Sequence, residues 1–131
     1  ENGSKYLDSI DLCYCKKING IKILNSIIEN KSTMVQLGFS GLDLDDDIIC
    51  KILLKFNSTL QVLGIGGCNN ITNDSIRLIT NKCSDTIISL VMHKLPLVTT
   101  DALIPLINCC TKLKKLNSPW KDYPVYYLNT I

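Results

Sequence analysis

The sequence predicts an α/β fold, a right-handed and horseshoe-like solenoid of about 4.5 strand–turn–helix units. Parallel strands are expected on its concave face and helices on its convex face. Two observations support this prediction. An apolar frame recurs five times at spacings of 26 or 27 residues, and in the second half of each unit the apolar period changes from that of a strand to that of a helix. Such a period is typical of stacked units that share one core, because a single unit cannot bury its apolar face alone.

The strand of each unit lies in the frame L-x-x-L-x-L-x-x-C-x-x-I, whose clearest copy is LQVLGIGGCNNIT at residues 60–72. Copies of the frame begin at five positions: Leu7, Met34, Leu60, Ile87 and Leu113. Since consecutive strands are one unit apart and are joined by right-handed crossovers, they are expected to pair in parallel. The whole chain, residues 1–131, is then a single domain.

A helix is predicted after the turn of each unit. Apolar residues stand 5, 8 and 12 positions after the last apolar residue of the frame, which places three side chains on one helix face. These residues are Ile49, Ile52 and Phe56; Ile76, Ile79 and Cys83; Leu103, Leu106 and Cys110. The candidate N-caps, each with an acidic residue in the first turn that favours the helix dipole, are Asp45 with Asp47, Thr72 with Asp74, and Thr99 or Thr100 with Asp101.

Aromatic residues are expected to close the array at its C-terminal end. Trp120, Tyr123, Tyr126 and Tyr127 predict a cap over about residues 117–131, because a terminal repeat needs one. A partner-binding tail is the alternative interpretation. The N-terminus has neither an initiator methionine nor an apolar signal region, so the chain is expected to be a fragment of a longer protein.

Composition favours one soluble domain with a single core. The chain is 46% hydrophobic and 20% charged, and it contains no apolar run long enough to cross a membrane. A net charge of +2, without a basic stripe interleaved with aromatic residues, argues against nucleic acid as a partner. The seven cysteines are an odd number, and we interpret them as reduced thiols of an intracellular protein. The compartment is expected to be cytoplasmic or nuclear, with a mitochondrial location as the alternative.

The pattern L-x-x-L-x-L-x-x-C-x-x-I-T-[ND], followed by a helix that ends in cysteine, resembles the cysteine-containing leucine-rich repeat. Residues 60–83 carry the best copy, and the resemblance covers roughly residues 7–118. This subtype is typical of F-box/leucine-rich-repeat proteins, the substrate receptors of cullin-type ubiquitin ligases. A related short form occurs in the mitochondrial ATP synthase coupling factor B. Leu42 and Leu95 replace the turn cysteine in two units, and no F-box is visible in the chain.

The resemblance implies a non-enzymatic module for protein–protein interaction, such as the substrate-recognition part of an F-box-type ubiquitin ligase receptor. The alternative is a structural or assembly subunit of a larger complex, similar to coupling factor B. An enzyme is not expected, because the sequence shows no set of nucleophile, base and oxyanion donors.

Four features suggest ligand chemistry, and each has a simpler structural interpretation. The glycines at 64–67 lack both the Lys-Ser or Lys-Thr of a P-loop and the spacing of a dinucleotide loop. The cysteines lack a paired zinc-ligand spacing, and Cys15 and Cys68, both expected to be buried, lie two units apart. His93 is the only histidine and has no catalytic partner, and the acidic cluster at 43–47 is expected to cap a helix. Metals, cofactors and small-molecule substrates are therefore not expected.

The predicted partner surface is the concave face of the sheet. Strand alternation turns the residues between the apolar core positions toward that face. The candidate contact residues are Asp11, Gln36, Gly38, Val62, Gly64, Gly66, Ser89, Val91, His93 and Lys115. An apolar centre within a polar rim is typical of protein interfaces, and Gly64 and Gly66 are expected to leave the backbone bare for close approach. A protein partner is therefore predicted here, with a plain solvated sheet as the alternative.

Overall fold

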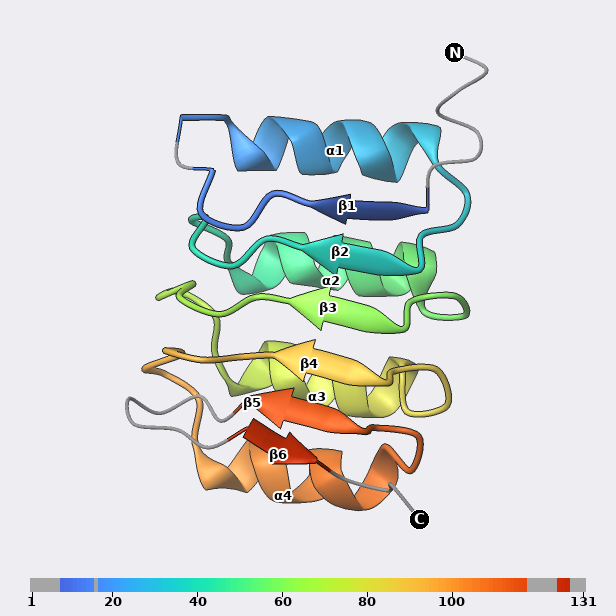
Figure 1. Cartoon of the computed structure of the whole chain (residues 1–131), viewed down its shortest axis with the longest axis vertical. Helices are drawn as coiled ribbons and strands as arrows, with labels where there is room; N and C mark the ends of the chain where they lie inside the picture. Colours follow the sequence, from blue (N-terminus) through green and yellow to red (C-terminus); the bar gives the residue numbers. More distant parts are fainter. Residues whose placement is uncertain (1–7, 16, 118–124, 128–131) are drawn as a thin grey trace.

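The computed structural model describes residues 8–15, 17–117 and 125–127 of the 131-residue chain (Figure 1). Within them it is an α/β protein with one six-stranded sheet and four helices. The strands are β1 (Ser9–Asp11), β2 (Gln36–Gly38), β3 (Val62–Gly64), β4 (Ser89–Val91), β5 (Lys115–Asn117) and β6 (Val125–Tyr127). The helices are α1 (Gly20–Asn30), α2 (Asp46–Phe56), α3 (Asn73–Lys82) and α4 (Thr100–Cys109).

The strands lie in the sheet in chain order, and β1 to β5 are parallel. Each residue pairs with its counterpart one unit later, so that Leu37 lies opposite Leu63 and Leu63 lies opposite Leu90. This register confirms the parallel pairing expected from the period of 26 or 27 residues. The strand β6 was not predicted, and it pairs antiparallel with β5. Trp120 and Tyr123, the first two aromatic residues of the predicted cap, lie outside the described residues.

All four helices lie on the same side of the sheet (Figure 1). The starts of α2 and α3 follow the predicted capping: the Asp45 carboxylate accepts a hydrogen bond from the Ile48 amide, and the Thr72 hydroxyl accepts one from the Asp74 amide. Asn19 caps α1 in the same way, through the Lys22 amide. Thr99 is the N-cap of α4, as predicted, but its side chain makes no capping bond. Helices form here because each has a polar cap followed by an apolar face that the sheet can cover.

The core fills the layer between sheet and helices. The predicted helix-face residues of α2, α3 and α4 are all buried, as are the frame residues of the second, third and fourth units. The first unit is less enclosed, since Ile10 and Leu12 are only half-buried. The expectation that Cys15 is buried is wrong: its side chain is exposed. Among the described residues, the turn that holds Cys15 has a neighbouring unit on one side only.

The contacts of Cys68 show why the third unit has a buried cysteine at the turn position of the frame. The Cys68 thiol donates a hydrogen bond to the Leu42 carbonyl oxygen of the preceding unit, at 3.0 Å. Burial raises the pKa of Cys68 to about 11, so the thiol stays protonated and can donate. Cys68 therefore links two consecutive turns while it packs as a small apolar side chain.

Candidate functional site

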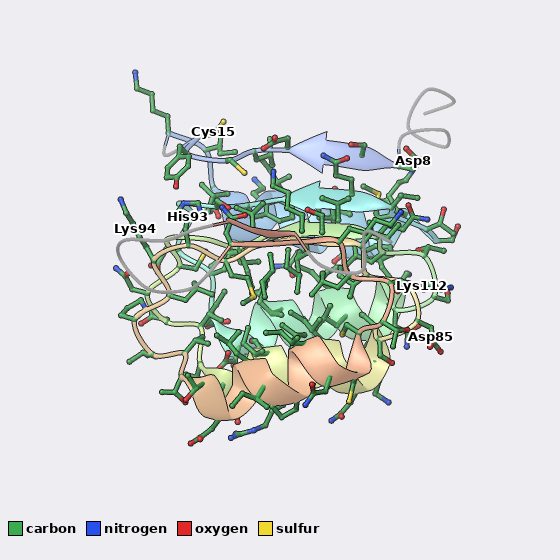
Figure 2. The ribbon with its side chains drawn as sticks, turned by 60° about the horizontal axis from the view of Figure 1, so that its bottom comes forward. Asp8, Cys15, Asp85, His93, Lys94 and Lys112 are labelled. Atoms are coloured by element: carbon green, nitrogen blue, oxygen red, sulfur yellow. The ribbon has the colours of Figure 1, made fainter. Side chains whose placement is uncertain are left out.

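The sheet has one face against the helices and one face turned away from them, which we call the strand face. Figure 2 shows this face above the helices, with Cys15, His93 and Lys94 at one end of the strands and Asp8 at the other. The ten predicted contact residues come from five consecutive units. Most lie within β1 to β5, and Gly66 and His93 come just after β3 and β4. The strand face therefore brings together residues that are up to about a hundred positions apart in the sequence.

Glycines form the floor of the strand face at its centre. The register places Asp11, Gly38, Gly64 and Val91 side by side on consecutive strands. The two middle strands thus lack side chains in this row, while their neighbours on either side carry them. A hollow of about 80 Å³ results, lined by Asp11, Cys13, Gln36, Leu37, Gly38, Ser40, Val62, Gly64 and Val91.

The Asp11 carboxylate forms the acidic wall of this hollow. Its Oδ1 accepts a hydrogen bond from the Cys13 amide at 3.0 Å. Hydrogen bonds from the Cys13 side chain and amide lower the pKa of Asp11, so the group is ionised at neutral pH. A Cβ atom at Gly38 would lie 2.8 Å from Asp11 Oδ1, and only glycine therefore leaves room for the carboxylate in this position.

Where the strands end, the strand face is closed by a contact between two side chains that we call the Tyr14–His93 bridge. The Tyr14 hydroxyl hydrogen-bonds His93 Nε2, and the two rings lie 27° from parallel with centroids 6.2 Å apart. A Cβ atom at Gly41 would meet the Tyr14 ring, and one at Gly66 would meet the His93 ring. Side chains from the first and fourth units therefore cross above glycines of the second and third.

The residues of this bridge have an unusual electrostatic and backbone setting. Burial lowers the pKa of His93, and the positive charge of Lys94 lowers it further. Tyr14 and Lys94 both have positive φ angles, of 60° and 54°. They occupy the same place in their units as Gly41 and Gly67, whose φ angles are 80° and 74°. Tyr14 was not among the candidate residues, although its alignment with two glycines was visible in the sequence.

The exposure of the glycines differs from the sequence-based expectation. Gly64 and Gly66 are buried, and the prediction that Gly66 leaves the backbone bare is wrong because the His93 ring covers it. Gly64 is open toward the hollow, but a Cβ atom there would lie 3.3 Å from Ser40 Oγ. The absence of a side chain at Gly64 therefore allows neighbouring units to pack closely and also keeps the hollow open.

The remaining candidates form the rim of the strand face. Asp11 and Lys115 are exposed at its two sides, on β1 and β5. Gln36, Val62, Ser89 and Val91 are half-buried. Small and apolar residues thus lie between Asp11 and Lys115 across the sheet, and the Tyr14–His93 bridge occupies one end of the strand face.

Two carboxylates of the acidic cluster at 43–47 accept hydrogen bonds at helix starts, as predicted from the sequence: Asp45 at α2 and Asp46 at α3. Asp46 Oδ1 accepts a hydrogen bond from the Thr72 amide at 3.0 Å, and its Oδ2 accepts one from the Thr72 hydroxyl at 2.6 Å. Burial alone would raise the pKa of Asp46, but hydrogen bonds from Ser75 and Thr72 outweigh it and lower the pKa. Among the described residues, no group of three or more His, Cys, Asp or Glu side chains is arranged to hold a metal ion.

No protein-family model matches the chain, and a search of curated proteins finds no significant match. Across the part of the chain that the structure describes, no helix has both the length and the apolar character needed to cross a membrane. The geometry of the strand face is therefore the basis for the functional proposal.

Proposed function

We propose that the chain is a non-enzymatic protein-interaction module, a short leucine-rich-repeat solenoid that binds a protein partner on the strand face. The observation that carries this proposal is the small hollow at the centre of that face, with Val62 and Val91 beside glycines and with polar residues around it. Its volume of about 80 Å³ is well below the roughly 300–1,000 Å³ of ordinary small-molecule sites. A hollow of this size suits a single side chain of a protein partner.

Two larger hollows lie beside the loops at the two ends of the strands and are weaker candidates. One of about 460 Å³ lies beside the turns of the first two units, and one of about 380 Å³ lies where helices return to strands. Neither contains a described set of nucleophile, base and orienting group. The strand face is the stronger candidate because five units contribute to it in one continuous register.

The proposed biological role is substrate recognition within an F-box-type ubiquitin ligase receptor. Its support is the repeat frame and the cysteine-ended helix of residues 60–83, which resemble the subtype found in such receptors. The full-length protein should then co-precipitate with the adaptor that links F-box proteins to the cullin. Co-fractionation with mitochondrial membranes, without the adaptor, would instead favour the assembly-subunit alternative.

Substitution of the half-buried valines tests the binding face directly. We expect Val62→Glu and Val91→Glu to reduce capture of partner proteins at least tenfold, because each replaces an apolar contact with a longer, hydrated side chain that fills the hollow. Leu54→Glu is the matched control, since Leu54 is 56% exposed on α2 at the opposite side of the molecule. Circular dichroism of all three variants checks that they fold. If both valine variants capture the same partners as the parent, the strand face is not the binding surface.

A further inference from the structure

The central hollow has one charged wall and an apolar opposite side. Asp11 comes from β1, while Val62 and Val91 come from β3 and β4. The backbones of β1 and β4 lie three strand spacings apart, about 14 Å at roughly 4.8 Å per spacing, and the Asp11 carboxylate reaches over Gly38 into this width. The floor between them consists of Gly38 and Gly64, which contribute no side chains. A group that enters this hollow therefore meets a carboxylate on one side and methyl groups on the other.

The charge of the hollow comes from Asp11 alone among its lining residues. Burial raises the pKa of the Cys13 thiol, which is therefore neutral at pH 7. None of the described lysines lines the hollow. A carboxylate has about four acceptor positions, so Asp11 retains capacity beyond its bonds to Cys13. The hollow is thus an anionic site without a cation in its lining.

The size of the hollow restricts what can fill it. One water molecule needs about 10–15 Å³ on this scale, so about 80 Å³ accepts a short chain of several heavy atoms. A lysine side chain meets these demands, since it has a narrow apolar stem and a compact ammonium group. The planar guanidinium of arginine is broader and needs a matching fork of acceptors, which a single carboxylate beside glycines supplies less well.

We propose that the hollow is a subsite for a lysine side chain of the protein partner. The lysine stem packs against Val62 and Val91, and its ammonium group pairs with the Asp11 carboxylate. This inference rests on the proposed function, because the lysine is supplied by a protein bound on the strand face. The partner segment then carries a lysine at its centre rather than an acidic or bulky aromatic residue.

Binding of n-butylammonium, a mimic of the lysine side chain, tests the subsite without knowledge of the partner. Titration into ¹⁵N-labelled protein at low salt should shift the amide resonances of Gly38 and Gly64, with n-butanol as the uncharged control. We expect Asp11→Asn to weaken butylammonium binding roughly fivefold, the upper range for an exposed ion pair, and to leave butanol unaffected. Gly64→Ala should also weaken it, because the added methyl group enters the hollow 3.3 Å from Ser40 Oγ and 3.8 Å from Val91 Cβ. Ser89→Ala, on the strand face but outside the hollow, should not.

Equal shifts with butylammonium and butanol, or shifts that survive Asp11→Asn, would overturn the subsite proposal. Partner capture separates this failure from failure of the proposed function. If Val91→Glu abolishes capture while Asp11→Asn leaves it unchanged, the face binds a protein but not through a lysine in the hollow. If butylammonium binds at Gly38 and Gly64 while neither variant alters capture, the hollow recognises an ammonium group but the proposed interaction surface is wrong.

Discussion

At the scale of single residues, one turn position has the same backbone conformation in four units and different side chains. Gly41 and Gly67 adopt positive φ at no steric cost, whereas Tyr14 and Lys94 hold the same conformation against the preference of residues with a Cβ atom. Strain of this kind is retained where the surrounding structure or the function requires the side chain. Tyr14 supplies half of the Tyr14–His93 bridge, and Lys94 follows the histidine of the other half.

Lys94→Gly is expected to raise the free energy of unfolding by about 1 kcal/mol, because it removes left-handed strain at a position where two other units use glycine. The reciprocal change, Gly67→Ala, should lower it by about 1–2 kcal/mol. A Cβ atom at Gly67 would meet backbone atoms of Gly41 no closer than 3.5 Å, so this loss reports the backbone conformation rather than a clash. Urea unfolding of both variants measures the changes. A stable Gly67→Ala protein would show that the turn can relax out of the left-handed region.

His93 gives the stability of the protein a defined pH dependence. Because its pKa is lowered in the folded state, the unfolded chain takes up a proton at higher pH than the folded protein does. The contribution of neutral His93 is therefore complete above the ordinary histidine value of 6.5 and is lost as the pH falls through and below it. Asp11 and Asp46, whose pKa values are lowered from 3.8, act in a separate and more acidic range.

We expect the urea concentration at the unfolding midpoint to decrease as the pH is lowered from about 7 to about 5. The decrease should be smaller in His93→Gln, because glutamine cannot take up a proton. Because the chain has a single histidine, an NMR titration of its ring protons reports the pKa without assignment ambiguity. Lys94→Gly should move this pKa upward by removing a nearby positive charge. A folded-state pKa at or above 6.5 would contradict the prediction.

The residues of the core could be predicted from the sequence more fully than the contacts of the strand face. The burial of Cys68 and Cys83 followed from a period that many residues share. The Tyr14–His93 bridge joins residues 79 positions apart and depends on side-chain reach, which a repeat pattern does not encode. The hollow depends on where glycines happen to adjoin larger residues, so its outline was visible in the sequence while its volume was not.

At the scale of elements, side chains at helix starts connect neighbouring units. Asp46 of α2 accepts hydrogen bonds from Thr72, the N-cap of α3. Asn73 of α3 does the same for Thr99, the N-cap of α4: its Nδ2 donates to the Thr99 hydroxyl at 2.8 Å, and its Oδ1 accepts from the Thr99 amide at 2.9 Å. Thr99 itself makes no side-chain bond to its own helix. The first residue of α2 and of α3 thus holds the N-cap residue of the next helix in place.

Asp46→Ala is expected to lower the free energy of unfolding by about 2 kcal/mol, since it removes the charged acceptor of Thr72 and Ser75. Asp46→Asn should lose less, because Asn73 shows that an asparagine amide can make the equivalent bonds. Asp47→Ala is the matched control: Asp47 is exposed in the same first turn, and its loss should remove only about 0.5 kcal/mol of dipole interaction. Thermal and urea unfolding compare the three variants. Equal losses for Asp46→Ala and Asp47→Ala would contradict a role in joining units.

At the scale of the whole molecule, the constant period translates directly into an in-register sheet. The five strands and the helices of the second, third and fourth units followed from apolar spacing, because burial on one side requires that spacing, and the helix of the first unit was expected from the repeat. The antiparallel strand β6 did not follow, since Val125–Tyr127 lies outside the repeating frame. The reduced burial of the first unit also escaped prediction, because the frame is the same there but a neighbour on one side is absent among the described residues.

Stability should therefore be highest in the middle of the sheet. Leu63→Ala, in the fully buried centre of β3, is expected to lower the free energy of unfolding by about 3 kcal/mol. The corresponding change in the first unit, Ile10→Ala, should cost only about 1 kcal/mol, because Ile10 is half-buried. Urea unfolding compares the two sites, which hold the same place in their units. Similar losses would show that the first unit is as tightly packed as the third.

The Tyr14–His93 bridge also has a consequence for the order of assembly. Its partners belong to the first and fourth units, so the two rings can meet only after the second and third units have stacked between them. The bridge therefore forms only when the first four units have stacked, and no smaller set of units can produce it. In a refolding experiment, the histidine ring resonance should reach its native position only after the backbone amides of β2 and β3 have become protected from exchange.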